Sequence, residues 1–240
     1  MNDLVKIASD SEYNNVGELM GINEALMGDE EWNQMGAIEK VQLLKRMGKS
    51  NASRGSRAEF EKFFKEVPAS VKKQLLDGDL RLADFTIFSM KQVKSKTVKM
   101  FEPQDEREVG LRNIANGKLP KNFVFLVSGI YLLAGVSASA VDIEQIKATD
   151  FKSVGLMPAI ANAEFSLKAN KKQIIPEGNI VRKFITDNNH LTNLGYFKLD
   201  NPRLIKDDEL IEFVVELGTM TGLDPNTFLY VGLDGTGTTP

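Results

Sequence analysis

The sequence predicts a mainly β protein: a jelly-roll or β-sandwich domain of about eight strands that follows an α-helical N-terminal region. Two observations predict this fold class. Up to about Leu80 the apolar residues have helical spacing among many charged ones, whereas from Leu82 onward apolar and polar residues alternate as in strands. The alternating segments recur at intervals of roughly 10–15 residues and are separated by turn residues, which is typical of two-sheet sandwiches. We therefore expect a helical region over residues 1–80 and a sandwich domain over residues 81–240.

The expected helical region divides into an arm and three helices. Residues 1–35 have only partial helical spacing, so an arm that becomes ordered on a neighbour and a frayed terminus are both open. Residues 37–47 have the spacing of an amphipathic helix. Ser56 begins a capping box, which predicts the start of a second helix that buries its phenylalanines. Pro68 should open the third helix, which should stop at Gly78.

The expected strands share strict alternation or a short apolar run between turn residues. They are Leu82–Phe88, Thr97–Phe101, Lys121–Tyr131, Ala163–Lys168, Gln173–Ile175, Ile180–Ile185, Tyr196–Leu199, Ile211–Leu217 and Leu229–Leu233. The third of these is apolar on both faces, so we expect it to be covered on two sides. Pro176 should end the fifth strand. Gln104–Asn116 is charged and fits a helical excursion or a long loop, and residues 137–160 are expected to be a long connection.

Composition excludes several kinds of chemistry. The chain has no cysteine, which rules out disulfides, thiolate metal sites and cysteine nucleophiles. A net charge of −3 does not indicate a global polyanion-binding role. The most apolar run, Phe123–Val136, is shorter than the roughly 20 residues that span a bilayer, so no transmembrane segment is expected. The first residues lack a basic region followed by an apolar one, so no secretory signal is expected.

The individual motifs predict neither an enzyme nor a cofactor. His190 is the only histidine and has no Gly-x-Ser-x-Gly elbow to accompany it, so we expect a solvated loop residue. Asp207–Glu209 lacks the spacing of a calcium loop and is expected to be a solvated turn. Gly232, Gly235 and Gly237 lack the Lys-Ser/Thr pair and the helix of a phosphate loop, so they should mark a strand end and a flexible tail.

Opposite charges are segregated in the first third of the chain. Residues 1–39 hold one base and nine acids, whereas residues 40–73 hold ten bases and three acids. The candidate interaction residues are basic: Lys40, Lys45, Arg46, Arg54, Arg57, Lys62, Lys65, Lys72 and Lys73. We favour a solvated face or a docking site for the acidic residues 1–39. Contact with nucleic-acid phosphates, whose strength would fall steeply with salt, is the alternative. The phenylalanines between these bases have the spacing of a core face and not that of a base-stacking platform.

Several stretches of the β half resemble strands of known shell proteins. The run Leu119-Pro-Lys-Asn-Phe-Val-Phe-Leu-Val-Ser-Gly-Ile-Tyr-Leu-Leu133 resembles an opening strand of phage jelly-roll shells. The likeness continues through Asn162–Ala169, Gly195–Ile205, Ile211–Leu217 and Asn226–Gly235. Residues 118–237 therefore resemble jelly-roll virion structural (capsid) proteins of bacteriophages, tailless phages included. The helical N-terminal third has no counterpart in this resemblance.

The resemblance implies a virion structural protein that is not an enzyme: a self-assembling capsid subunit whose N-terminal helical extension contacts other subunits. Its partners would be further copies of itself, as a homo-oligomer, and other virion proteins. It would be located in the virion after assembly in the host cytoplasm, and it would need no cofactor. Closed shells follow from head-to-tail contacts whose rotation closes.

Two other classes of function are alternatives. The first is a jelly-roll binding module for host attachment or carbohydrate, since the fold alone cannot separate this function from a shell. Clustered exposed aromatic residues would favour it, but the chain offers only Trp32, outside the β half, and the tyrosines Tyr13, Tyr131, Tyr196 and Tyr230. The second is a cupin-like metal enzyme, which usually has several histidines where this chain has one.

Overall fold

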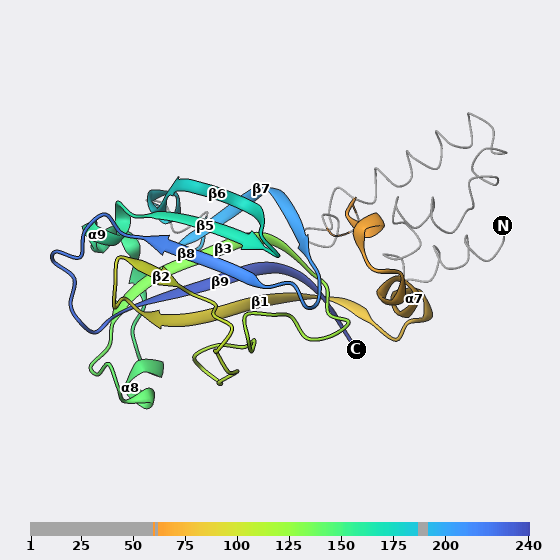
Figure 1. Cartoon of the computed structure of the whole chain (residues 1–240), viewed down its shortest axis with the longest axis horizontal. Helices are drawn as coiled ribbons and strands as arrows, with labels where there is room; N and C mark the ends of the chain where they lie inside the picture. The colour runs from red at the N-terminus through yellow and green to blue at the C-terminus, as the bar shows by residue number, and fades with distance from the viewer. Residues whose placement is uncertain (1–59, 61, 187–191) are drawn as a thin grey trace.

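Two antiparallel sheets form the framework of the described part of the protein, as shown by a computed structural model that describes residues 60, 62–186 and 192–240 (Figure 1). Nine strands lie in these described residues: β1 (Arg81–Gln92), β2 (Thr97–Lys99), β3 (Phe125–Val136), β4 (Lys152–Ser153), β5 (Glu164–Ala169), β6 (Lys172–Ile180), β7 (Tyr196–Ile205), β8 (Ile211–Glu216) and β9 (Thr227–Thr239). The helices named there are short: η1 (Phe64–Glu66), α7 (Ala69–Asp77), α8 (Ile143–Lys147), η2 (Val154–Leu156), α9 (Pro158–Ala161) and η3 (Val181–Phe184). The prediction of a mainly β protein is confirmed.

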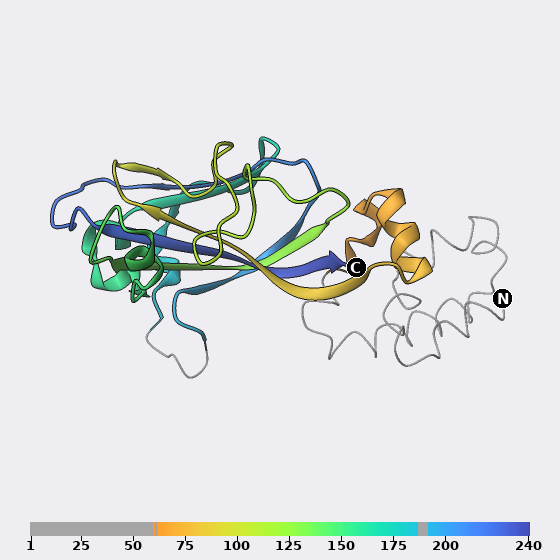
Figure 2. The same cartoon turned by 90° about the horizontal axis from the view of Figure 1, so that it is seen from below.

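The two sheets are stacked as two layers, which Figure 2 shows from a second side. The first sheet has the order β1-β9-β3-β4, and β7 also pairs with β3. The second sheet has the order β2-β8-β5-β6. Strands far apart in the sequence therefore lie side by side, and β1 is paired along its whole length with β9.

The main core fills the space between the two sheets. Alternate residues of β8, such as Ile211 and Phe213, and of β9, such as Leu229 and Val231, are buried there. Burial of each such side chain stabilises the fold by about 1.5–3 kcal/mol. The pleat sends every second side chain to the same face of a strand, so the predicted inward faces of both strands are confirmed.

A second, smaller core lies on the outer face of the first sheet. Phe60, Phe64, Val71 and Leu75 pack there against residues that include Leu126 of β3. β3 is consequently buried on both faces over its first residues. The two-sided apolar pattern of this strand predicts such cover, and the prediction is confirmed.

α7 has the boundaries that the sequence predicts. It begins directly after Pro68 and ends at Gly78. The backbone of Gly78 has a φ of 82°, in the left-handed region that glycine adopts without steric cost. β1 follows at once, so the change from helical to strand periodicity near Leu80 coincides with the change in structure.

Two strand predictions in the second sheet are wrong. β6 continues through Pro176, because β6 is an edge strand where the missing N–H of a proline need not reach a neighbour. The pairing of β6 with β5 is irregular: its register shifts on both sides of Leu167. Residues 181–184 form the 3₁₀ helix η3 instead of a strand. Three residues make one turn of such a helix, so Val181 and Phe184 lie on the same side, and both are buried.

The prediction of a flexible tail after Leu233 is also wrong. Residues 234–239 belong to β9, which pairs with β1 on one side and with β3 on the other. Gly235 permits this central position, because a Cβ there would collide with the carbonyl oxygen of Leu126. Thr236 and Thr238 are buried beside it. The Gly-Thr alternation therefore belongs to a strand in the middle of the first sheet.

The connections follow the sequence in part. Residues 102–118 form a loop with isolated bridges, which resolves the choice between a helical excursion and a long loop. Residues 137–160 are the predicted long connection and contain α8, the two-residue strand β4, η2 and the start of α9. β7 extends the strand predicted over Tyr196–Leu199 as far as Ile205. Among the residues that the structure describes, no helix is long and apolar enough to cross a membrane.

Some predictions concern residues outside the described ranges. They are the arm over residues 1–35, the helix over residues 37–47, the capping box at Ser56 and the surroundings of His190.

Candidate functional site

The nine predicted basic residues divide between two parts of the chain. Outside the described ranges lie Lys40, Lys45, Arg46, Arg54 and Arg57. On the segment that carries η1 and α7 lie Lys62, Lys65, Lys72 and Lys73. The Nζ of Lys72 donates a hydrogen bond to the carbonyl oxygen of Lys65 at 3.1 Å and lies 5.6 Å from the centre of the Phe64 ring. The structure thus brings four of the nine onto one helical segment.

The phenylalanines of this segment belong to a core. Phe60 and Phe64 are buried against the first sheet, so the prediction that they are core residues and no stacking platform is confirmed. Lys62, Lys65 and Lys73 are exposed. The segment therefore suits ionic contacts better than stacking on bases.

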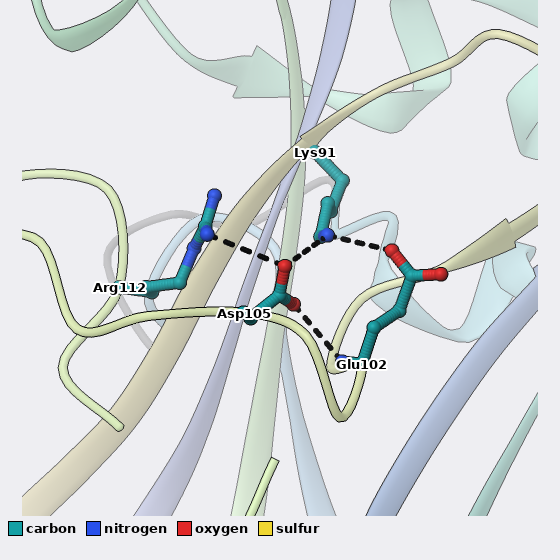
Figure 3. A network of polar contacts seen from close by, with 4 residues as sticks. All are labelled: Lys91, Glu102, Asp105 and Arg112. Carbon is teal, nitrogen blue, oxygen red and sulfur yellow. Dashed lines mark hydrogen bonds and ion pairs between the residues drawn. The ribbon is translucent and has the colours of Figure 1, made fainter. Parts of the chain in front are cut away.

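A charged network joins β1 to the loop that follows β2 (Figure 3). The Nζ of Lys91 lies 2.6 Å from Oδ1 of Asp105 and 2.7 Å from Oε2 of Glu102. The Nη1 of Arg112 lies 3.3 Å from the same oxygen of Asp105. The other Asp105 oxygen accepts a hydrogen bond from the backbone N–H of Glu102 at 2.9 Å. Asp105 is only 7% exposed, so its charge depends on these partners.

This network holds the loop and offers little chemistry of its own. The hydrogen bond from Lys91 holds the pKa of Glu102 below its ordinary value. A groove of about 580 Å³ lies beside the network, and Lys94, Lys99 and Phe228 are among the residues that line it. The two cations, Lys91 and Arg112, are paired with the two carboxylates of the same network. These ion pairs fix the loop against β1.

Three of the chain's four tyrosines gather elsewhere, on the outer face of the first sheet. Tyr131 of β3 lies opposite Tyr196 of β7, and the centres of their rings are 4.8 Å apart. The ring of Tyr230 on β9 lies 6.0 Å from that of Phe88 and 5.7 Å from that of Phe151. We define the tyrosine surface by seven residues: Thr86, Phe88, Tyr131, Phe151, Tyr196, Tyr230 and Asp234.

The pleat of the sheet explains why these rings share a face. Ile130 and Leu132 flank Tyr131 and belong to the main core, so Tyr131 lies on the opposite face. Val231 also belongs to the main core, so its neighbour Tyr230 lies on the outer face of the sheet. All members of the tyrosine surface are half-exposed.

Two glycines make room for the rings. A Cβ on Gly129 would collide with the ring and the hydroxyl of Tyr196, so this ring lies directly over Gly129. A Cβ on Gly232 would lie 3.3 Å from the hydroxyl oxygen of Tyr230 and 3.1 Å from Cγ2 of Thr86. The rings consequently lie low over the sheet.

A carboxylate lies among these rings. Oδ1 of Asp234 accepts a hydrogen bond at 3.0 Å from the hydroxyl of Thr86, the residue opposite it on β1. Burial raises the pKa of Asp234. Burial also raises the pKa of Tyr196 and of Tyr230, and the Asp234 charge adds to both shifts. The tyrosine surface thus combines aromatic faces, hydroxyl groups and one acceptor carboxylate, a composition that suits a ligand with both polar and apolar groups.

Sequence reasoning missed this surface. The alternation of side chains along β3 shows on which face of that strand Tyr131 lies, and the alternation along β9 does the same for Tyr230. Their meeting also requires the order in which β1, β9, β3 and β7 pair, and no local pattern encodes that order.

The acidic cluster that the sequence singles out holds backbone N–H groups, one in a distant segment and one in its own turn. Oδ2 of Asp207 accepts a hydrogen bond from the backbone N–H of Asn122 at 2.8 Å. Oε2 of Glu209 accepts one from the backbone N–H of Lys206 at 3.1 Å. Within residues 60, 62–186 and 192–240, no group of three or more Asp, Glu, His or Cys residues is arranged to hold a metal ion.

No protein-family model matches the chain, and no curated protein matches it.

Proposed function

We propose that the protein is a virion structural protein: a self-assembling jelly-roll capsid subunit of a bacteriophage, with an N-terminal helical extension that contacts other subunits. Its partners are copies of itself and other virion proteins, it acts without catalysis, and it assembles in the host cytoplasm. The pairing of the strands is the observation that carries this proposal.

Without the two-residue strand β4, the pairing describes one long ribbon. β1 pairs with β9, β2 with β8, β3 with β7 and β5 with β6, so each strand pairs with the one equally far from the other end. Rolling up such a ribbon brings β9 beside β3 and β8 beside β5, which are the two further pairs. A rolled ribbon of eight strands is a jelly roll, the fold of many viral shell proteins. The pairing supports the proposal as an analogy at the level of the fold.

Several sheet edges are protected, which limits how subunits can meet. Asn113 shields β1: its Oδ1 accepts a hydrogen bond from the N–H of Phe88 at 2.9 Å, and its Nδ2 donates one to the carbonyl of Thr86 at 2.7 Å. β6 contains Pro176, and β2 has only three residues. Such edges resist the addition of a strand from another chain. We therefore assign the contacts between subunits to the ends of the sandwich.

The end around α8 exposes apolar side chains. Val109 is 82% exposed, Val141 87% and Ile143 45%, and we call these three residues the α8 patch. An ion pair joins the two segments that carry the patch, the loop with Val109 and the segment with α8. In it, the Nζ of Lys147 lies 3.5 Å from the carboxylate of Glu108. Apolar side chains that gather on a surface are typical of protein–protein contacts.

The opposite end of the sandwich carries α7 (Figure 1), whose sequence includes Lys72 and Lys73. The α8 end thus exposes the three apolar side chains of the α8 patch, whereas the α7 end exposes the lysines Lys62, Lys65 and Lys73 together with a few acidic residues. Two unlike ends suit head-to-tail contacts, which close into rings or shells when the rotation between neighbours allows it. An ionic contact through the lysines of the α7 end would weaken at high salt.

Light scattering coupled to size exclusion, on the full chain at low and high salt, tests the proposal. We expect discrete oligomers or particles. The variant Val141→Asp/Ile143→Asp should weaken association by about tenfold or more, because each apolar contact would be replaced by a buried charge. Ile180→Asp is the matched control, since Ile180 is 42% exposed but lies on β6, and it should assemble like the wild type. A chain that stays a monomer at both salt concentrations, alone and with the other particle components, would contradict the proposal.

A further inference from the structure

We propose that the tyrosine surface is a binding site for a carbohydrate, a function that goes beyond self-assembly. The site joins five half-exposed aromatic rings with a carboxylate and a hydroxyl on the outer face of one sheet. The second core covers another part of the same face, around Leu126. The tyrosine surface thus occupies a part of the sheet that the segment with η1 and α7 does not cover.

The aromatic rings suit the apolar face of a sugar. The face of an aromatic ring is negative and attracts polarised C–H groups, which a pyranose ring presents on one side. Tyr196 lies over Gly129, and Tyr230 lies beside Gly232, so both rings stay close to the sheet. Tyr131 is tilted by 48° against Tyr196. Tyr196 and Tyr230 thus form a shallow floor on which a sugar unit can lie without a deep pocket, and Tyr131 is inclined to it.

The polar groups lie in the row next to these rings. Thr86 and Asp234 are opposite each other on β1 and β9, and the following row of the same face holds Gly232 and Tyr131. Such rows are about 7 Å apart, because they are separated by two residues of a strand. A carboxylate accepts hydrogen bonds through two oxygens, and Thr86 uses one of those positions through its proton. Asp234 can therefore accept hydroxyl groups of a sugar that lies on the rings.

The size of the surface indicates a short oligosaccharide. It crosses β1, β9, β3 and β7, which gives a width of roughly 14 Å at the usual strand spacing. Along β9 it extends from Tyr230 to Asp234, again roughly 14 Å. A ligand of a few sugar units would cover this area.

A second copy of the chain is the competing occupant, and the carboxylate argues against it. An apolar protein face on the tyrosine surface would bury Asp234 without a cation, which is costly. A sugar supplies hydroxyl donors to Asp234 and tolerates water at its margins. The α8 patch suits contacts between copies better, because its exposed side chains carry no polar group.

Binding of the full chain to an array of immobilised glycans tests this proposal. The array should hold bacterial surface polysaccharides together with glucan and chitin oligosaccharides. We expect at least one of them to bind, with a dissociation constant in the micromolar to millimolar range by calorimetry. Tyr230→Ala and Asp234→Asn should each weaken this binding by about tenfold. Asp200→Asn is the matched control, because Asp200 is an exposed aspartate on β7, and it should bind like the wild type.

Further measurements separate the site from the fold and from assembly. Thermal unfolding followed by circular dichroism shows whether each variant is folded. Tyr196→Phe should keep more affinity than Tyr196→Ala, because the ring stays over Gly129. The proposal is overturned if none of the glycans binds, or if Tyr230→Ala and Asp234→Asn leave binding unchanged. Loss of the oligomer in these two variants would make the surface a subunit contact and would also overturn it.

Discussion

The ring of Tyr196 lies directly over Gly129, on the neighbouring strand of the first sheet. Gly129 stands at the point where the register of β3 shifts, opposite Asp234 on β9. The ring of one strand therefore occupies the space where the other strand would carry a side chain. This contact couples the backbone of β3 to the tyrosine surface.

Gly129→Ala should lower the free energy of unfolding by about 1–3 kcal/mol, because the new methyl group must displace the Tyr196 ring. Urea denaturation followed by circular dichroism measures this loss. In a Tyr196→Ala background the same substitution should cost much less, because the obstacle is gone. Gly218→Ala is the control, since a Cβ there meets nothing within 4 Å. Equal losses in both backgrounds would show that another group excludes a side chain at Gly129.

Asp105→Asn should lower the free energy of unfolding by about 2–3 kcal/mol, because Lys91 and Arg112 lose the anion that they share. The same denaturation experiment measures it. Asp150→Asn is the matched control: Asp150 pairs with Lys152 at 3.2 Å but its side chain is 79% exposed, so the loss should stay below about 1 kcal/mol. Similar losses in the two variants would mean that the network in Figure 3 is worth no more than a surface ion pair.

Removal of residues 235–240 should prevent folding. Over this length β9 pairs with Arg81–Phe85 of β1 and with Phe125–Val127 of β3, so both neighbours would lose backbone hydrogen bonds in the middle of the sheet. Removal of Pro240 alone should be neutral, because this residue is exposed and follows β9. Circular dichroism and limited proteolysis compare the two. A cooperative thermal transition in the shorter chain would contradict the central role of β9.

Asp234 should give stability a pH dependence of defined sign. Burial raises the pKa of Asp234, so the folded protein binds this proton more tightly than the unfolded chain does. The contribution is therefore fully present below the ordinary pKa of an aspartate and is lost as the pH rises through the raised pKa. An asparagine at position 234 does not titrate, so Asp234→Asn lacks this pH-dependent loss of stability. The free energy of unfolding of the variant should therefore rise relative to that of the wild type as the pH is raised from acidic to neutral. Free energies of unfolding across that range measure the difference, and a relative gain by the wild type would mean that the pKa is lowered instead.

The strands show how far local pattern predicts the fold. Ile211–Glu216 alternates because one face of β8 packs on the main core, and α7 stops at Gly78 because glycine adopts the left-handed backbone. Pro176 shows the limit. Whether a proline ends a strand depends on the presence of a neighbour on its N–H side, which is a property of the sheet.

The candidate sites show the same limit. Lys62 and Lys73 could be named from charge alone, because a run of basic residues is visible in the sequence. The tyrosine surface could not be predicted in this way, because Tyr131, Tyr196 and Tyr230 come from three strands that are far apart in the chain.

Local sequence pattern was enough to predict the mainly β character, the change from helix to strand near Leu80 and the faces that β8 and β9 bury. These features depend on the periodicity of residues that are neighbours in the chain. The tertiary structure alone decided the central place of β9, the shielding of β1 by Asn113 and the meeting of the tyrosines around Asp234. Pairing between distant segments is settled by the packing of whole sheets, and no stretch of sequence carries it alone.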